Sequence, residues 1–199
     1  MVTHPVSKAD SPSGPGAVKS RRRTRRLSVW DRLVVRRWQR IRVPGALNRL
    51  LITFVRVGDG WGWAVIAVVL FQYQPWPRFL LIVEQGLLAV AISLPVYWGL
   101  KLGFRRSRPN MGAKGFIPQV PPLDKYSFPS GHVMNNLAVA MTLAYHIPSL
   151  WPAAVVVPLS LGLLRVLYGV HFISDIAAGA LLGAFSSWLA QGLFPRLFY

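Results

Sequence analysis

The stretch Pro129-Ser130-Gly131-His132 stands directly before a long apolar segment and predicts a helix that begins there. Pro129 disfavours helical backbone in the residue before it, and Ser130 is a favoured helix N-cap. Gly131 lets the backbone approach a ligand closely, and the first helical turn attracts anions through its free N–H groups and dipole. His132 adds a group that transfers protons near neutral pH. The stretch therefore indicates phosphate chemistry, with a capped helix and an incidental histidine as the alternative.

Two further groups of residues favour phosphate chemistry. They have the forms K-x6-R-P and R-x5-H-x3-D, carried by Lys101, Arg108 and Pro109 and by Arg165, His171 and Asp175. Together with the tetrapeptide they specify ten positions in order within 75 residues. Guanidinium and ammonium groups can hold the oxygens of a phosphoryl group in transit, and an imidazole can attack its phosphorus.

This triple motif resembles that of the type 2 phosphatidic acid phosphatase family, which comprises integral-membrane lipid phosphatases related to the vanadium haloperoxidases. The resemblance covers the chain from about Gly58 to the C-terminus. It implies that His171 is the nucleophile, that His132 is the general acid and that Asp175 orients His171. It also implies a phosphate cradle made by Lys101, Arg108, Ser130, Gly131 and Arg165. The serine that the family has before the third-motif arginine is Leu164 here, so a difference is expected in affinity or substrate type rather than in reaction class.

Several polar residues outside the triple motif are interpreted separately. Asn135 and Asn136 lie one turn below His132 and are expected to support the site as hydrogen-bond donors, with helix packing as the alternative. Asp59, between two glycines, is interpreted as a turn residue. Arg105 and Arg106 are interpreted as ordinary cations beside a membrane span and are left outside the site.

No metal site is expected from the acidic residues. Glu84, Asp124 and Asp175 are scattered along the chain and form no carboxylate cluster. The chain has no cysteine, so thiolate metal sites and disulfides are impossible. We therefore predict that the protein needs no metal and no other cofactor.

The composition predicts a membrane protein. Hydrophobic residues make up 53%, charged residues only 15%, and the mean hydropathy is +0.39. The net charge of +17 could indicate nucleic-acid binding, but 14 of the 23 Lys and Arg residues lie between Lys8 and Arg56, beside apolar segments. This distribution favours the surface of an anionic membrane and phosphorylated lipid, and we expect no nucleic-acid partner.

The chain divides into three predicted parts. Residues 1–26 form a disordered basic tail, residues 27–57 form amphipathic interfacial helices divided at Pro44 and Gly45, and residues 58–199 form the membrane domain. Apolar segments at 61–73, 79–100, 132–147, 150–168 and 176–194 predict an all-α transmembrane bundle of about five to six helices, with five crossings. Small residues in the last segment, Gly179, Ala180, Gly183 and Ala184, predict close helix packing there.

The order of the spans gives a geometric test of the motif. Lys101 to Pro109 follows one span, Ser130 begins the next, and the span after that returns near Tyr168. All three parts of the motif are therefore expected on one membrane face. The basic N-terminal region shares that face, so the positive-inside rule favours the cytoplasm for the site and the outer side for Tyr199.

The predicted function is hydrolysis of a phosphomonoester or pyrophosphate of a membrane lipid through a phosphohistidine. Candidate substrates are phosphatidic acid, phosphatidylglycerophosphate, polyprenyl phosphates or pyrophosphates, and phosphorylated lipid A. One alternative is a phosphotransferase in which a lipid or sugar hydroxyl replaces water. Another is a non-catalytic membrane protein that binds anionic lipid. The family resemblance implies a bacterial inner-membrane location, and the sequence does not indicate an oligomeric state.

Overall fold

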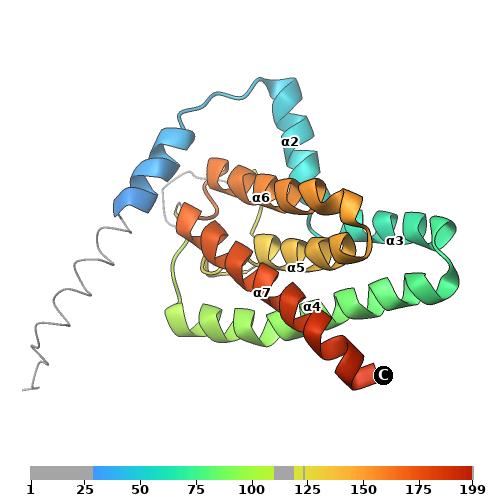
Figure 1. Cartoon of the computed structure of the whole chain (residues 1–199). Helices are drawn as coiled ribbons and strands as arrows, with labels where there is room; N and C mark the ends of the chain where they lie inside the picture. Colours follow the sequence, from blue (N-terminus) through green and yellow to red (C-terminus); the bar gives the residue numbers. More distant parts are fainter. Residues whose placement is uncertain (1–28, 110–118, 123, 199) are drawn as a thin grey trace, which may run out of the picture.

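The computed structural model describes residues 29–109, 119–122 and 124–198, and these residues form an all-α bundle without strands (Figure 1). A helix at residues 29–38, called here the N-terminal helix, precedes the other elements. These are α2 (Gly45–Val57), α3 (Trp61–Tyr73), α4 (Trp76–Phe104), α5 (Gly131–His146), the 3-10 turn η1 (Pro148–Leu150), α6 (Trp151–Leu167) and α7 (Ile173–Phe198). The predicted fold class is confirmed, whereas the predicted disordered tail at 1–26 lies outside the described residues.

Proline and glycine set most of the helix boundaries. Pro44 precedes α2, which begins at Gly45 where the sequence predicted a division. Gly60, with φ of 128°, turns the chain between α2 and α3 in a conformation that side chains rarely adopt. Pro75 precedes α4, and Ser130 is the N-cap residue of α5 as predicted. Proline, glycine and the N-cap serine therefore set where α2, α3, α4 and α5 begin.

Fewer helices than expected are long enough to cross a membrane. Within the described residues, Trp76–Phe104, Pro148–Leu167 and Ile173–Leu197 meet the length and hydropathy of a span. The pair α2 and α3, bent by 67°, adds a fourth if it counts as one span. The predicted five crossings are not all met, because α3 has 13 residues and α5 has 16. At about 1.5 Å per residue these helices are shorter than the roughly 30 Å hydrocarbon layer.

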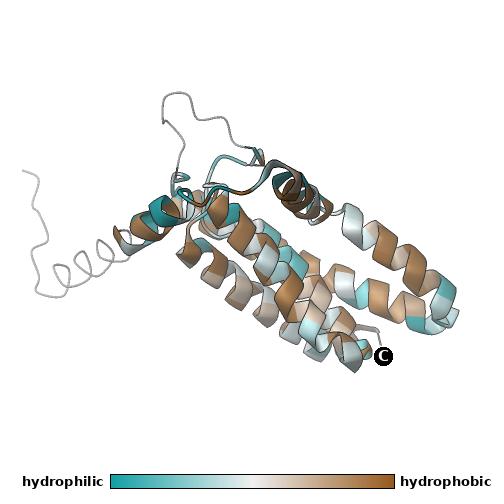
Figure 2. Ribbon diagram, turned by 90° about the horizontal axis from the view of Figure 1, so that it is seen from above, coloured by the Kyte–Doolittle hydropathy of each residue, from teal (hydrophilic) through white to brown (hydrophobic). Residues whose placement is uncertain are grey.

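Hydrophobic side chains face outward along the bundle, as expected in lipid. Figure 2 shows hydrophobic residues along much of α3 to α7 and hydrophilic residues on the N-terminal helix. Leu87 of α4, Val156 of α6 and Leu181 of α7 are each at least 60% exposed. In water such side chains would be unfavourable, so their exposure supports a lipid-facing surface.

The short helix α5 lies at the centre of the bundle and packs against α4, α6 and α7. Its buried residues include Val133, Met134, Ala138 and Ala144. His132 near its start and His146 at its end contact different parts of the bundle, Asp59 and Gln85 respectively. Because α5 is enclosed by its neighbours, it holds the tetrapeptide at a fixed place.

Two glycines allow α7 to lie directly against the backbone of α5. A Cβ added at Gly183 would lie 2.3 Å from the carbonyl oxygen of Met134, and one at Gly179 would lie 2.6 Å from that of Ser130. These distances are too short for a side chain and involve rigid backbone. The predicted close packing is therefore confirmed at these two positions.

We expect Gly183→Ala to destabilise the protein by about 1–3 kcal/mol, because α7 must move away from α5 to admit the methyl group. Gly192→Ala is the matched control in the same helix, since nothing lies within 4 Å of a Cβ there. Thermal unfolding in detergent should show a lower Tm for Gly183→Ala and an equal or higher Tm for Gly192→Ala. Equal Tm values for Gly183→Ala and wild type would contradict the close contact.

Candidate active site

All three parts of the motif meet at one end of the bundle, as the order of the spans predicted. The site cavity has a volume of about 240 Å³ and its lining includes Arg108, His132, Arg165 and His171. Asn135, Asn136 and Gly131 also line it, together with Tyr97, Asp59 and Asp124. Lys101, Ser130 and Asp175 are buried beside this cavity and contact its lining residues.

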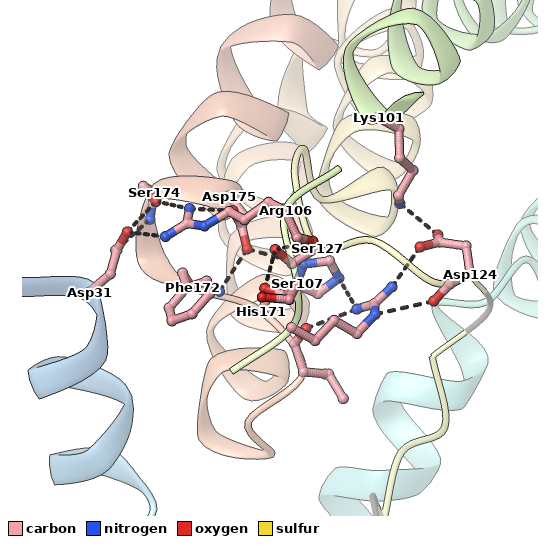
Figure 3. Close-up of polar contacts among 12 residues, drawn as sticks. Asp31, Lys101, Arg106, Ser107, Asp124, Ser127, His171, Phe172, Ser174 and Asp175 are labelled. Carbon is pink, nitrogen blue, oxygen red and sulfur yellow. Dashed lines mark hydrogen bonds and ion pairs between the residues drawn. The ribbon is translucent and has the colours of Figure 1, made fainter. Parts of the chain in front are cut away.

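Lys101 and Arg108 converge on the carboxylate of Asp124 (Figure 3). Lys101 Nζ lies 2.6 Å from Asp124 Oδ2, and Arg108 Nη2 lies 2.8 Å from Asp124 Oδ1. The hydroxyl of Tyr97 also donates to Oδ2, at 2.6 Å. Burial opposes ionisation of Asp124, but the hydrogen bonds from Lys101 and Tyr97 and the neighbouring cations hold its pKa below the ordinary value. The Asp124 carboxylate is therefore paired with two cations that could instead bind an anionic ligand.

Arg165 and His132 converge on a second carboxylate, that of Asp59. Arg165 Nη2 lies 2.8 Å from Asp59 Oδ1, and His132 Nε2 contacts both the carboxylate and the guanidinium. The side chain of Arg165 is only 1% exposed. Its Nε is buried and has no hydrogen-bond partner among the described residues. Such a donor is costly to bury, which is consistent with a ligand that accepts from it.

His171 lies in the loop between α6 and α7, beside Arg108 and Asp175. Its Nδ1 lies 3.6 Å from Asp175 Oδ2, and its Nε2 lies 3.2 Å from Arg108 Nη1. We assign the proton to Nδ1, which faces the carboxylate, so that Nε2 accepts from the guanidinium. Burial lowers the pKa of His171 to about 4, because the charged imidazole is disfavoured away from water. The ring is therefore neutral near pH 7, and its Nε2 carries a lone pair that faces the Arg108 guanidinium.

His171 and Asp175 do not lie on one helical face. α7 begins at Ile173, so His171 precedes the helix, and the 3.6 Å separation is longer than a hydrogen bond. The backbone N–H of Phe172 instead donates to Asp175 Oδ2 at 2.8 Å. The carboxylate thus holds the chain between the two residues and places His171 next to itself.

Ser130 and Gly131 act differently from a simple cap. The Ser130 hydroxyl makes no capping hydrogen bond, and its Oγ is buried with no partner among the described residues. The Ser130 backbone N–H donates to the carbonyl oxygen of Asp175 at 3.1 Å, which joins the starts of α5 and α7. A Cβ at Gly131 would lie 2.7 Å from the Tyr97 ring. Gly131 therefore lets Tyr97 of α4 close over the start of α5.

The two asparagines below His132 have separate contacts. Asn136 donates to the carbonyl oxygens of His132 and Gly58, at 2.7 and 3.0 Å, and accepts from Trp63 Nε1 at 2.9 Å. Asn135 accepts from the hydroxyl of Ser93 at 2.9 Å. Asn136 thus fixes the segment that carries Asp59 against α5, whereas Asn135 links α5 to α4.

The sequence interpretation missed three polar residues of the site, namely Asp59, Asp124 and Arg106. Asp59 is an ion-pair partner and is not merely a turn residue. Arg106 pairs with Asp175 at 2.7 Å and is not merely a cation beside a span. The chain has only six acidic residues against 23 basic ones. An acidic residue beside an apolar segment of so basic a chain is expected to have a buried partner, and this was the available signal.

The described residues contain no group of three or more His, Cys, Asp or Glu side chains arranged to hold a metal ion. The charges that face the cavity come instead from guanidinium, carboxylate and imidazole groups. Such a set can bind an anion in exchange for a carboxylate, donate or accept a proton at His132 and offer a nitrogen lone pair at His171.

Comparisons with known proteins agree with this chemistry. The chain is 30% identical over 164 residues to phosphatidylglycerophosphatase B of Bacillus subtilis, covering 77% of this chain and 71% of that protein. It is 32% identical over 123 residues to decaprenylphosphoryl-5-phosphoribose phosphatase of Mycobacterium tuberculosis, covering 62% and 66% of the two chains.

Solved structures show the same fold. A transmembrane PAP2 type phosphatidylglycerolphosphate phosphatase from Bacillus subtilis matches with a TM-score of 0.64 and 25% identity, over 87% of this chain and 88% of that one. Aquifex aeolicus LpxE matches with a TM-score of 0.61 and 23% identity, over 79% and 92%, and supports the fold alone. Residues 85–198, which hold the whole triple motif, match the PAP2 superfamily. The chain therefore belongs to the PAP2 superfamily and is an integral-membrane phosphatase of the PAP2 type.

Proposed function

We propose that this protein hydrolyses the phosphate ester or pyrophosphate of a membrane lipid through a phosphohistidine formed on His171. The observation that carries the proposal is the buried imidazole of His171, whose Nε2 lies 3.2 Å from the guanidinium of Arg108. Burial lowers the pKa of His171, which favours the neutral imidazole. A neutral imidazole beside a cation can attack a phosphorus whose oxygens that cation neutralises.

The residues divide the reaction between them. Arg108 and Arg165 hold the equatorial phosphoryl oxygens, with Lys101, the Ser130 hydroxyl and the backbone N–H of Gly131 completing the cradle. His171 Nε2 forms a bond to phosphorus while the bond from phosphorus to the lipid oxygen breaks, and protonated His132 gives that oxygen its proton. Water then attacks the phosphohistidine and gives a proton to His132, which releases inorganic phosphate and restores both histidines.

Binding of the phosphate must rearrange ion pairs within the site. In the structure Asp124 pairs with Lys101 and Arg108, and Asp59 pairs with Arg165. The Arg108 guanidinium also covers the Nε2 lone pair that must attack. An entering phosphate replaces these partners on the cations and so frees His171 for attack.

Apolar cavities beside the site support a lipid substrate. A cavity of about 400 Å³ between α3, α5 and α6 shares Gly58, Trp63 and Asn136 with the site cavity. Another of about 340 Å³, between α3, α4 and α5, shares Trp63 and Val139 with it. Relatives act on phosphatidylglycerophosphate and on a decaprenyl-linked phosphate, according to their names. The substrate class we infer is a phosphorylated lipid whose chains extend into these cavities.

Phosphate release from purified lipids tests this function. We expect the protein in detergent to release phosphate from at least one of phosphatidic acid, phosphatidylglycerophosphate, undecaprenyl phosphate, undecaprenyl diphosphate and lipid A 1-phosphate, also in the presence of a chelator. His171→Ala should abolish release, because it removes the imidazole that is proposed to carry the phosphoryl group.

His146→Gln is the control, since His146 lies at the other end of α5 and contacts Gln85. It should retain activity close to wild type. Release at the wild-type rate by His171→Ala, or complete loss in chelator that a divalent ion restores, would contradict the mechanism.

The role of His132 predicts a dependence on the leaving group. We expect His132→Ala to lower kcat by about 10²–10⁴-fold on a lipid alkyl phosphate, because the departing alkoxide needs a proton. The loss should be far smaller on an aryl phosphate such as 4-nitrophenyl phosphate, whose oxygen leaves without one. Equal losses on both substrates would count against His132 as the general acid.

We infer that the site faces the cytoplasm and that the N-terminal helix lies on the anionic leaflet there. Trp30 and Leu33 are more than half exposed on that helix, beside exposed Arg36 and Arg37, a combination that suits a membrane surface. α7 runs away from the site, so its end lies at the opposite end of the bundle (Figure 1).

A reporter that is active only after export should therefore be active when it is fused after Tyr199. The same reporter fused after Phe104, at the site end of α4, should be inactive. A cytoplasm-dependent reporter should show the opposite pattern. Cytoplasmic activity of the fusion after Tyr199 would exclude this orientation.

A further inference from the structure

We propose that Asp31 and Arg106 are positioning residues for the catalytic carboxylate of Asp175, and that the N-terminal helix is through them part of the active site. The inference rests on the function proposed for His171 and Asp175. Neither Asp31 nor Arg106 belongs to the triple motif, and neither lines the site cavity.

Arg106 binds two carboxylates at once with different nitrogens (Figure 3). Its Nη1 lies 2.7 Å from Asp175 Oδ1, and its Nη2 lies 2.7 Å from Asp31 Oδ2. Nη1 also donates to the hydroxyl of Ser174 at 2.6 Å. The guanidinium carbon lies 4.0 Å from the centre of the Phe172 ring, over its face. These contacts fix the plane of the guanidinium directly behind the loop between α6 and α7 that carries His171, called here the catalytic loop.

The two carboxylate oxygens of Asp175 have different partners, and through them the position of Arg106 affects His171. Oδ1 is taken by Arg106, and Oδ2 accepts from the Phe172 N–H and faces His171 Nδ1. A carboxylate that lost the contact at Oδ1 could rotate about its last bond and turn away from the imidazole. Arg106 therefore sets the direction from which Asp175 supports the charge that develops on His171 during attack.

Asp31 in turn fixes Arg106 and the first turn of α7. Asp31 is 1% exposed, and besides Arg106 it accepts hydrogen bonds from the Ser174 hydroxyl and, at 3.2 Å, from the Ser174 backbone N–H. A carboxylate this deeply buried is stable only when it is paired and hydrogen-bonded. Its contacts all lead to Arg106 or to the residue next to Asp175.

The N-terminal helix presents Asp31 together with two hydrophobic residues on the same face. Val35 and Trp38 follow at helical spacing and pack with Val166, Phe172 and Ile176. Trp30 and Leu33 remain exposed on the other side. The helix is thus docked through one face onto the catalytic loop, and its other face is available to the membrane surface.

A double-mutant cycle tests the proposal on the intact chain. Asp31→Asn and Arg106→Gln should each lower kcat by about tenfold or more, because a small misplacement of catalytic groups is costly. KM and the inhibition constant of vanadate should stay within about threefold of wild type, because neither side chain contacts the phosphate. The double variant should lose no more than the worse single variant, because both act through one contact. The substrate is the lipid phosphate released fastest in the panel above.

Arg105→Gln is the matched control, since Arg105 is the neighbouring residue and its side chain donates to the carbonyl oxygen of Leu102 and to no carboxylate within the described part of the chain. It should retain wild-type kcat. If Asp31→Asn and Arg106→Gln fail to fold, Ser174→Ala decides, because it removes only the hydroxyl that bridges Asp31 and Arg106; it should lower kcat severalfold at unchanged KM.

Values of kcat within twofold of wild type in Asp31→Asn and Arg106→Gln, or in Ser174→Ala where those do not fold, would overturn the proposal. The proposal would also be overturned if a rise in KM and in the inhibition constant of vanadate accounted for the whole loss of kcat/KM. The underlying function is tested separately, by phosphate release that wild type shows and His171→Ala lacks. Failure of the positioning pair is therefore distinguishable from failure of the proposed phosphatase reaction.

Discussion

Charge neutralisation at one end of an apolar bundle is the constraint on which the rest of this structure depends. Lys101, Arg108 and Arg165 are almost completely buried, and an unpaired buried charge is strongly destabilising, by about 3–5 kcal/mol when a partner is removed. Asp59 and Asp124 supply the partners of these three cations. The same pairs prepare the site for phosphate, because a phosphoryl group can replace a carboxylate on a guanidinium without leaving the cation bare.

The charged site can exist only because the helices beneath it are closely and rigidly packed. α5 is enclosed by α4, α6 and α7, and the backbone of α7 at Gly179 and Gly183 touches that of α5. This contact brings Asp175 within hydrogen-bond distance of Ser130, through the carbonyl oxygen of the former and the N–H of the latter. The distance between His132 and His171 is thus set by backbone packing, which leaves little freedom for the site to loosen.

The N-terminal helix has two faces of different composition. Its inner face carries Asp31 into the network behind Asp175, and Val35 into the hydrophobic cluster with Phe172. Its outer face carries exposed aromatic, aliphatic and basic residues. A lipid phosphatase must work where its substrate headgroups lie. Under the proposed function, the N-terminal helix would hold the chemistry at that depth by contacting both the membrane surface and the catalytic loop.

The sequence by itself determined most of the helices, the class of reaction and the meeting of the three parts of the motif at one end of the bundle. Helix boundaries follow from proline, glycine and apolar segment length, which are local properties, and the order of the spans placed the three parts of the motif at one end. Only the tertiary structure decided which acidic residue pairs with which buried cation. Asp59 meets Arg165, Asp124 meets Arg108 and Asp31 meets Arg106 across long stretches of chain. It also decided that His171 is buried and neutral, and that His171 precedes α7. Side-chain pairing and burial depend on how helices pack in three dimensions, and neither periodicity nor motif spacing carries that information.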